Sequence, residues 1–137
     1  MPECVFCEFV EKQTRHKQLI FENEKILAIL DDNPIAHCHT LVILKEHHPD
    51  ITTVSPKDAG ELGKIVAHVA VAIKNAYNAK MVYVASLGES VRHVHYHLVP
   101  CYESSKASGF SHFLSPREKL RYGSDIAEVV RKHLAKL

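Results

Sequence analysis

The chain has 137 residues, of which 46% are hydrophobic and 24% charged, so it can bury a core and is too apolar for a disordered or low-complexity protein. Seventeen Lys and Arg residues against sixteen Asp and Glu residues give a formal net charge of +1, which provides no strong field for nucleic acid or an anionic membrane. Histidine is the outlier, with 11 copies. Because histidine titrates near neutral pH and is the commonest metal ligand, the positions of these residues indicate the function.

The length suits a single domain over residues 1–137, and no repeat or linker-like stretch divides it. Residues 1–12 carry acidic side chains and no apolar run long enough for a secretory signal or a membrane helix. Four cysteines without an export signal indicate a reducing compartment, where thiols and metal ligands are commoner than disulfides. We therefore expect a cytoplasmic protein with no membrane or nucleic-acid partner.

The first part of the chain predicts two buried strands after a short cysteine-bearing segment. Residues 4–10 contain a Cys-x-x-Cys pair. Residues 25–31 (KILAILD) and 40–45 (TLVILK) are short, apolar and rich in β-branched side chains, which favours strands over helices. The sequence Asp-Asp-Asn-Pro at 31–34 is a strong turn signal that ends the first strand.

A long amphipathic helix is predicted next. Ser55 suits the N-cap and Pro56 the first helical position. Beyond them, apolar side chains recur at spacings of three and four, which predicts a helix of about five or six turns that ends at Asn78. The apolar stripe consists of Ala59, Leu62, Ile65, Val66, Val69, Ala70, Ile73 and Tyr77.

The rest of the chain predicts a hairpin, an irregular tail and a final helix. Met81–Ala85 and residues 91–100 are the hairpin strands, with a turn at 87–89. The tail after Cys101 is rich in serine, and a helix begins near Ser124. Runs of strands with helices inserted between them, rather than strict alternation, indicate an α+β fold with an antiparallel sheet.

Three histidines alternate with apolar residues in the second of these hairpin strands. On a strand, His93, His95 and His97 would line one face, with successive imidazoles about 6.5–7 Å apart. A strict period of two is hard to explain as a coincidence of surface residues. Two functional interpretations follow: the rings chelate one metal ion, or the middle ring is a nucleophile whose neighbours act on the substrate and select its tautomer.

The segment His-Val-His-Tyr-His-Leu-Val at 93–99 matches the histidine triad motif in full, and the chain resembles the histidine triad (HIT) family over roughly residues 4 to 100. Further landmarks occur in the family order, namely Asp31, His39, the Lys-x-His of His47, and Gly88 with Ser90 before the triad. The resemblance implies an antiparallel sheet of about five strands, one long central helix, a C-terminal helix and a homodimer.

The resemblance also implies a nucleotidyl hydrolase or transferase. Such an enzyme would cleave purine nucleoside phosphoramidates, adenylylated compounds or dinucleoside polyphosphates at the α-phosphate and yield an AMP-type product. His95 would be the nucleophile that forms a covalent nucleotidyl-histidine. His97 would contact the phosphate and the leaving group, and His93 and His39 would belong to the supporting network.

Four residues are implied to bind the substrate: Asp31, Gly88, Glu89 and Ser90. Ser90 would hydrogen-bond the phosphate and Asp31 would accept the ribose hydroxyls, although Asp31 also suits a simple turn-initiating role. Glu89 stands where the family commonly has Gln, and a carboxylate beside a polyphosphate is repulsive unless it is protonated or turned away. The alternative function is therefore a nucleotide-binding sensor or partner protein with weak turnover.

The Cys-x-x-Cys pair by itself leaves a redox dithiol, half of a metal site and coincidence open. The resemblance to the bacterial, zinc-carrying branch of the family implies a structural Zn²⁺ bound by Cys4, Cys7, His47 and His93. His48 is adjacent and could replace His47. Two thiolates and two imidazoles suit tetrahedral zinc with no open position, and no organic cofactor is expected.

Overall fold

The structure is a computed structural model that describes residues 4–12, 18–88, 90–117 and 125–137. In these ranges, five strands form one antiparallel sheet in the spatial order β1-β2-β3-β5-β4. The strands are β1 (Leu19–Glu22), β2 (Ile26–Leu30), β3 (Thr40–Leu44), β4 (Met81–Ala85) and β5 (His95–Cys101). The described helices are α1 (Val5–Lys12), the 3-10 helix η1 (Ile51–Thr53), α2 (Pro56–Tyr77), α3 (Phe110–Phe113) and α4 (Asp125–Leu134). The predicted α+β fold is confirmed.

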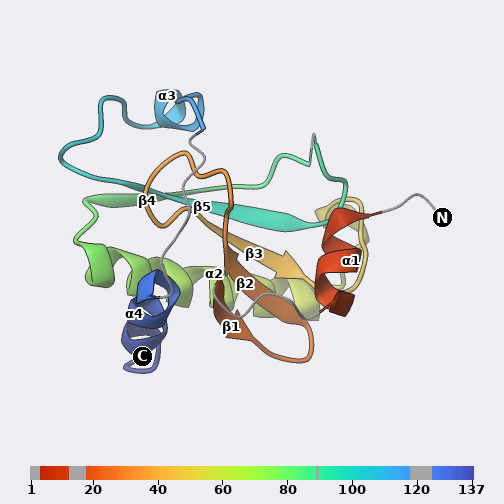
Figure 1. The fold of residues 1–137 in the computed structure, drawn as a ribbon. Coiled ribbons are helices and arrows are strands. Elements are labelled where there is room, and N and C mark those ends of the chain that lie inside the picture. The colour runs from red at the N-terminus through yellow and green to blue at the C-terminus, as the bar shows by residue number, and fades with distance from the viewer. Residues whose placement is uncertain (1–3, 13–17, 89, 118–124) are drawn as a thin grey trace.

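Helices α2 and α4 cover one face of the sheet (Figure 1). At the start of α2, Ser55 Oγ accepts a hydrogen bond from the Asp58 N–H at 3.1 Å and Pro56 takes the first helical position; at the end, Asn78 has a left-handed φ of 54°. The predicted cap, length and end of this helix are therefore confirmed. Its fully buried stripe packs on β2, β3 and β5 and consists of Leu62, Ile65, Val66, Val69, Ala72 and Ile73.

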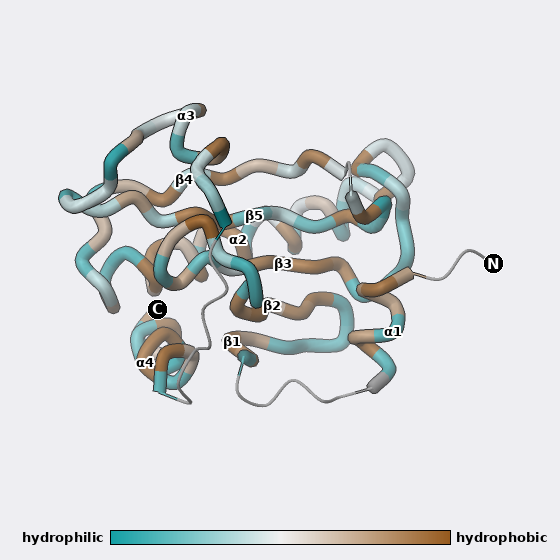
Figure 2. Tube along the Cα trace, turned by 45° about the horizontal axis from the view of Figure 1, so that its top comes forward, coloured by the Kyte–Doolittle hydropathy of each residue, from teal (hydrophilic) through white to brown (hydrophobic). Residues whose placement is uncertain are grey.

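The opposite face of the sheet carries a second, smaller core beneath α1. It consists of Phe6, Leu27, Ile29, Leu41 and Ile43. Strands β2 and β3 are thus buried on both faces, which explains why their sequences are continuously apolar rather than alternating (Figure 2). In the register of β3 with β5, His95 pairs with Ile43 and His97 pairs with Leu41. Both imidazoles therefore stand on the face of the smaller core.

The strand predicted over residues 91–100 is wrong at its start, because β5 begins at His95 and ends at Cys101. The segment before it bonds to other partners: the Val94 N–H donates to the His48 carbonyl at 2.8 Å, and the Leu44 N–H donates to the Val94 carbonyl at 3.3 Å. The connection from β4 to β5 thus runs from residue 86 to 94 and is longer than the predicted turn at 87–89. His93 precedes the strand, so the three triad histidines do not share one regular strand face.

The tail after β5 is less irregular than predicted. Helix α3 lies within it, on the face of the sheet away from α2 (Figure 1). The predicted C-terminal helix is present as α4, and its expected start near Ser124 lies outside the described residues. In the described part of the chain, no helix combines the length and the apolar composition needed to cross a lipid bilayer.

Candidate active site and metal centre

His95 and His97 are placed by β5 on the face of the smaller core. Their ring centroids are 5.0 Å apart, and the edge of Phe6 from α1 lies against His95 with a centroid separation of 4.8 Å. His95 is buried and His97 is half-buried. The sequence alternation correctly predicted that these two side chains share a face.

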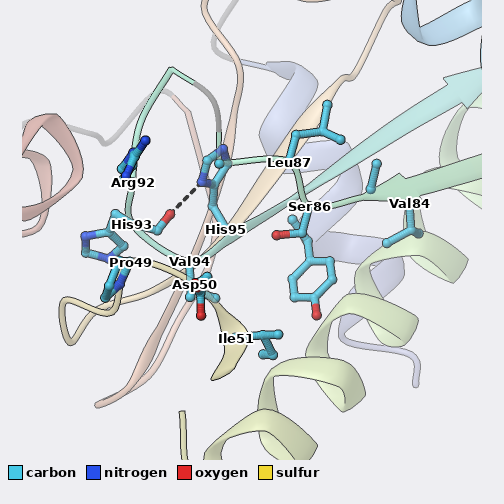
Figure 3. Close-up of a pocket in the computed structure, with 13 residues that line it drawn as sticks. Pro49, Asp50, Ile51, Val84, Ser86, Leu87, Arg92, His93, Val94 and His95 are labelled. Carbon is cyan, nitrogen blue, oxygen red and sulfur yellow. Dashed lines mark hydrogen bonds between the residues drawn. The ribbon is translucent and has the colours of Figure 1, made fainter. Parts of the chain in front are cut away.

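The tautomer of His95 follows from its contact with the backbone. Its Nδ1 lies 2.6 Å from the His93 carbonyl oxygen (dashed line in Figure 3). Because a carbonyl only accepts, Nδ1 carries the proton and donates it, and Nε2 is left with a lone pair. Burial lowers the pKa of His95, partly offset by the hydrogen bond to the His93 carbonyl. His95 is therefore neutral at pH 7 and has the protonation pattern of a nucleophile.

The tautomer of His97 is fixed through His39 in the same way. The Ile35 N–H donates to His39 Nδ1 at 3.0 Å, so a neutral His39 carries its proton on Nε2 and donates it to His97 Nδ1, 2.9 Å away. His97 must then carry its own proton on Nε2, as a donor. Burial lowers the pKa of His39 to about 3 and the pKa of His97 to about 4, so both rings are neutral at pH 7.

Asp31 directly follows β2 and is 9% exposed. Its Oδ1 accepts a hydrogen bond from the Asn33 N–H at 2.8 Å, and its Oδ2 accepts one from Arg117 Nη1 at 3.1 Å. The same Oδ2 lies 3.6 Å from His39 Nε2. Asp31 thus forms the predicted turn and also faces the histidines, so the two roles considered for it are compatible.

A hollow of about 370 Å³ joins these groups. The predicted site residues that line it are Asp31, Gly88, Ser90, His95 and His97. His39 lies behind His97, as a predicted supporting residue should. Glu89 lies outside the described residues.

A second hollow, of about 600 Å³, adjoins the first because both are lined by Leu87, Gly88 and His95 (Figure 3). It extends toward Asp50 and Arg92. His95 therefore lines both hollows, so its ring is accessible from either one.

His93, the first histidine of the triad motif, belongs to a different cluster. Its Nε2 lies 2.5 Å from the Leu44 carbonyl oxygen and must donate to it, which leaves a lone pair on Nδ1. That Nδ1 lies 3.3 Å from Cys4 Sγ, 3.6 Å from Cys7 Sγ and 3.2 Å from His47 Nδ1. Cys7 Sγ is also 3.4 Å from His47 Nδ1.

These separations fit a tetrahedral metal centre. With ordinary Zn–S and Zn–N bond lengths, the edges of the ligand tetrahedron are roughly 3.3–3.8 Å long. All four ligand atoms lie within 4.8 Å of one another. His48, the alternative ligand, is directed elsewhere, because its Nδ1 lies 2.9 Å from Thr53 Oγ1. The structure therefore brings together the four predicted ligands, with His47 rather than His48.

The interpretation of the triad as one three-histidine chelate is not supported. Among the described residues, the two groups that could hold a metal are the Cys4 cluster and a set of Asp31, His39 and His97, and neither contains His95. In the second set, His39 and His97 are already hydrogen-bonded to each other and Asp31 is paired with Arg117. The side chains of that set therefore already have hydrogen-bond partners within the protein.

Phe6 and Arg117 are among the residues of the site that the sequence analysis did not predict. Both line the hollow with His95. Phe6 could have been found from its place between the two cysteines, once these were taken as ligands near the triad. Arg117 stands in the serine-rich tail, and no spacing links it to Asp31, which is 86 positions earlier.

Comparison with known proteins agrees with this geometry. A model of the HIT domain matches residues 12–104. An uncharacterized HIT-like protein of Mycoplasma genitalium is 34% identical over 114 residues, which cover 79% of each chain. This chain belongs to the HIT family. The resemblance drawn from residues 93–99 and the landmarks before them is therefore confirmed.

Two further similarities bear on the site of this HIT protein. The chain is 28% identical over 141 residues to the adenylylsulfatase HINT3 of Arabidopsis thaliana, with 98% of this chain and 71% of that protein covered. A crystal structure of a Zn-bound histidine triad family protein from Mycobacterium smegmatis superimposes with a TM-score of 0.79 at 29% identity, and covers 98% of this chain and 94% of the other. The fold thus matches a HIT protein over almost its whole length.

Proposed function

We propose that this HIT protein is a nucleotidyl hydrolase or transferase that cleaves purine nucleoside phosphates at the α-phosphorus through a nucleotidyl-His95 intermediate. The hydrogen bond from His95 Nδ1 to the His93 carbonyl carries this proposal, because it leaves the Nε2 lone pair on a buried, neutral ring in the wall of the hollow. The side chain thus has the protonation that a nucleophile needs without a separate base.

The reaction proceeds in two displacements. First, His95 Nε2 attacks the α-phosphorus, the bond to the leaving group breaks with its electron pair, and an amine leaving group takes a proton from solvent as it departs. The ring becomes a cation whose Nδ1–H stays bonded to the His93 carbonyl. Water then attacks the phosphorus, the electrons of the bond between phosphorus and Nε2 return to Nε2, and the proton of the water passes to solvent. Dividing the reaction into two displacements at phosphorus gives each step a lower barrier than a single direct displacement by water.

The other polar groups serve the phosphate and the sugar. In the neutral tautomer set by His39, His97 presents its Nε2–H as a donor to the phosphoryl group. Ser90 lines the same hollow and donates its hydroxyl to the phosphate. Asp31 accepts the ribose hydroxyls.

Candidate substrates are nucleoside phosphoramidates, adenylylated compounds and dinucleoside polyphosphates. They share a nucleoside α-phosphate and differ in the leaving group. The similarity to a plant adenylylsulfatase adds adenosine 5′-phosphosulfate to the compounds worth testing.

We also propose that Zn²⁺ binds Cys4, Cys7, His47 and His93. The ligand separations and the similarity to a Zn-bound HIT protein support this assignment. Four protein ligands leave no open position, so the metal would supply structural cross-linking and no chemistry at the phosphate. His93 would thus serve two purposes, since its ring is a ligand and its carbonyl orients His95.

The decisive experiment compares the wild type with His95→Ala. Purified protein is incubated with adenosine 5′-phosphoramidate, diadenosine tetraphosphate and adenosine 5′-phosphosulfate, and AMP release is measured. We expect turnover of at least one of them, and a loss of at least about a thousandfold in kcat for His95→Ala with AMP affinity retained. His68→Ala, a change on α2 at a half-buried position outside both hollows, is the control and should keep wild-type turnover.

A quenched reaction provides the second measurement. With an α-³²P-labelled substrate, an acid-labile adduct should be found on His95 during turnover. Turnover without any adduct would rule out the covalent route. AMP binding with no turnover in the wild type would favour the nucleotide sensor instead, and loss of metal from His95→Ala would favour a triad that serves as a metal site.

A further inference from the structure

The tail of the chain runs back across the histidine face of the sheet. Its path is fixed by His112, which is buried with its Nε2 2.8 Å from the Pro100 carbonyl oxygen and its ring 6.0 Å from that of Tyr83. Tyr102 O–H donates to the His37 carbonyl at 2.7 Å. Helix α3 accordingly lies above β4 and β5, away from α2 (Figure 1). The segment after α3 therefore reaches the hollow that contains the histidines.

Arg117 is the tail residue that enters this hollow. Its Nη1 donates to Asp31 Oδ2 at 3.1 Å and to the Asn33 carbonyl at 2.9 Å. The arginine thus connects both ends of the turn that follows β2. Its side chain is 46% exposed, and it lines the hollow together with His95 and His97.

The contacts of Asp31 leave a defined number of acceptor positions. A carboxylate has about four lone-pair positions, two on each oxygen. The Asn33 N–H occupies one position on Oδ1, and Arg117 occupies one on Oδ2. Within the described part of the chain no other group donates a hydrogen bond to Asp31, so each oxygen retains one position, and these two match the two hydroxyl donors of a ribose cis-diol.

We propose that Arg117 is a positioning residue that makes Asp31 specific for the ribose diol. It holds the carboxylate in one orientation and fixes the Asn33 side of the turn. This inference rests on the proposed function and adds to it the sugar specificity of the site. The guanidinium suits this role because its planar fork reaches two acceptors in fixed directions, whereas a lysine ammonium is a flexible point charge.

The test pairs a change in the protein with a change in the sugar. Dissociation constants for AMP and 2′,3′-dideoxy-AMP are measured by calorimetry for the wild type, Arg117→Ala and Arg117→Lys. We expect Arg117→Ala to weaken AMP binding about tenfold and dideoxy-AMP binding less than about twofold, because the arginine acts through the hydroxyl contacts. Arg117→Lys should restore part of the AMP affinity, since it keeps the charge but not the fork.

Kinetics give a second readout. With adenosine 5′-phosphoramidate, Arg117→Ala should raise KM about tenfold and leave kcat within about threefold, because the nucleophile and its tautomer are unchanged. Lys106→Ala removes an exposed cation from the same tail and should leave both constants unchanged. The unfolding midpoint of each variant shows whether the fold is intact.

Each remaining outcome decides against the inference in a distinct way. Equal weakening of AMP and dideoxy-AMP binding would show that Arg117 contacts the phosphate or the base instead. No weakening of either would show that the ion pair with Asp31 is incidental. A wild-type protein that neither binds AMP nor turns over would refute the proposed function, whereas an active wild type with an unaltered Arg117→Ala would refute only the role of Arg117.

Discussion

The protons of the histidine site are positioned by backbone groups. The carbonyl of His93 fixes the proton of His95, the Ile35 N–H fixes that of His39, and the Leu44 carbonyl fixes that of the His93 ring. Because backbone groups have a fixed polarity, each ring is limited to one neutral tautomer. The result is a lone pair on His95 Nε2, which the proposed chemistry would use, and another on His93 Nδ1, which the proposed metal would use.

The burial of the His39 imidazole makes stability depend on pH. Its pKa is about 3 in the folded protein, because burial disfavours the charged ring, against 6.5 in the unfolded chain. Below pH 6.5 the unfolded chain binds a proton that the folded chain does not, so stability is full above pH 6.5 and falls as the pH drops toward 3. The burial of one such ring lowers the free energy of unfolding by about 2 kcal/mol between pH 7 and pH 5.

Urea unfolding of the wild type and of His39→Gln at both pH values measures this contribution. Glutamine cannot take up the proton, so the variant should lose about 2 kcal/mol less between pH 7 and pH 5. Acid-sensitive groups that do not interact with His39 cancel in this comparison. Equal losses in the two proteins would mean that His39 is not held neutral by burial.

The sequence was sufficient to place His95 and His97 but not His93. Alternation along a strand predicts a shared face only where the strand is regular, and β5 starts after His93. The direction of the His93 ring depends on Cys4, which is 89 positions away. The resemblance already grouped His93 with the two cysteines, and the fold shows that its ring faces that cluster while His95 and His97 line the hollow.

At the level of elements, contacts of Phe6, Cys4 and Cys7 with histidines on and beside the sheet account for the placement of α1. A helix of 8 residues is marginal by itself in water, so its position depends on contacts with the sheet. Phe6 packs against His95, and Cys4 and Cys7 on either side of it meet His47 and His93. A metal at this cluster would connect α1 to the sheet beside the nucleophile.

Loss of a ligand side chain should therefore release the metal. It should lower the stability of the fold more than it lowers the rate of the reaction. We expect Cys4→Ala and His47→Ala to lower the zinc content from one per chain to near zero and to reduce Tm by at least about 5 °C. His48→Ala is the matched control, since its ring is bonded to Thr53. Zinc is measured by mass spectrometry of the purified protein. Full zinc occupancy in Cys4→Ala would refute the site.

Elements with a clear local signal could be predicted from the sequence, whereas β1, α1 and α3 could not. Helix α2 has a cap, a stripe and an end signal, and β2 and β3 are continuous apolar runs. Strand β1 and helix α3 have only 4 residues each, and α1 has 8, too few for a periodic pattern. They are fixed by tertiary contacts such as that of Tyr83 with His112.

At the scale of the whole molecule, β4 is an edge of the sheet. It pairs with β5 on one side, and no strand of the described residues pairs with its other side. Met81 and Val84 on β4 are 49% and 45% exposed, and Val71 on the neighbouring α2 is 43% exposed. An unprotected edge with exposed apolar side chains favours pairing with another chain. We propose that two copies join through β4 to form the homodimer that the resemblance implies.

This proposal predicts that charge on β4 will separate the copies. Sedimentation velocity should give a dimer for the wild type, and Val84→Lys should shift the dissociation constant by at least about tenfold toward monomer, because an outward lysine protects a sheet edge from pairing. Leu137→Lys changes another exposed apolar residue, beyond α4, and should leave the dimer intact. If the wild type is monomeric at micromolar concentration, or if both variants dissociate alike, β4 is not the interface. Because His95 and β4 adjoin the same hollow, the turnover of the Val84→Lys monomer then shows whether the site needs the second copy.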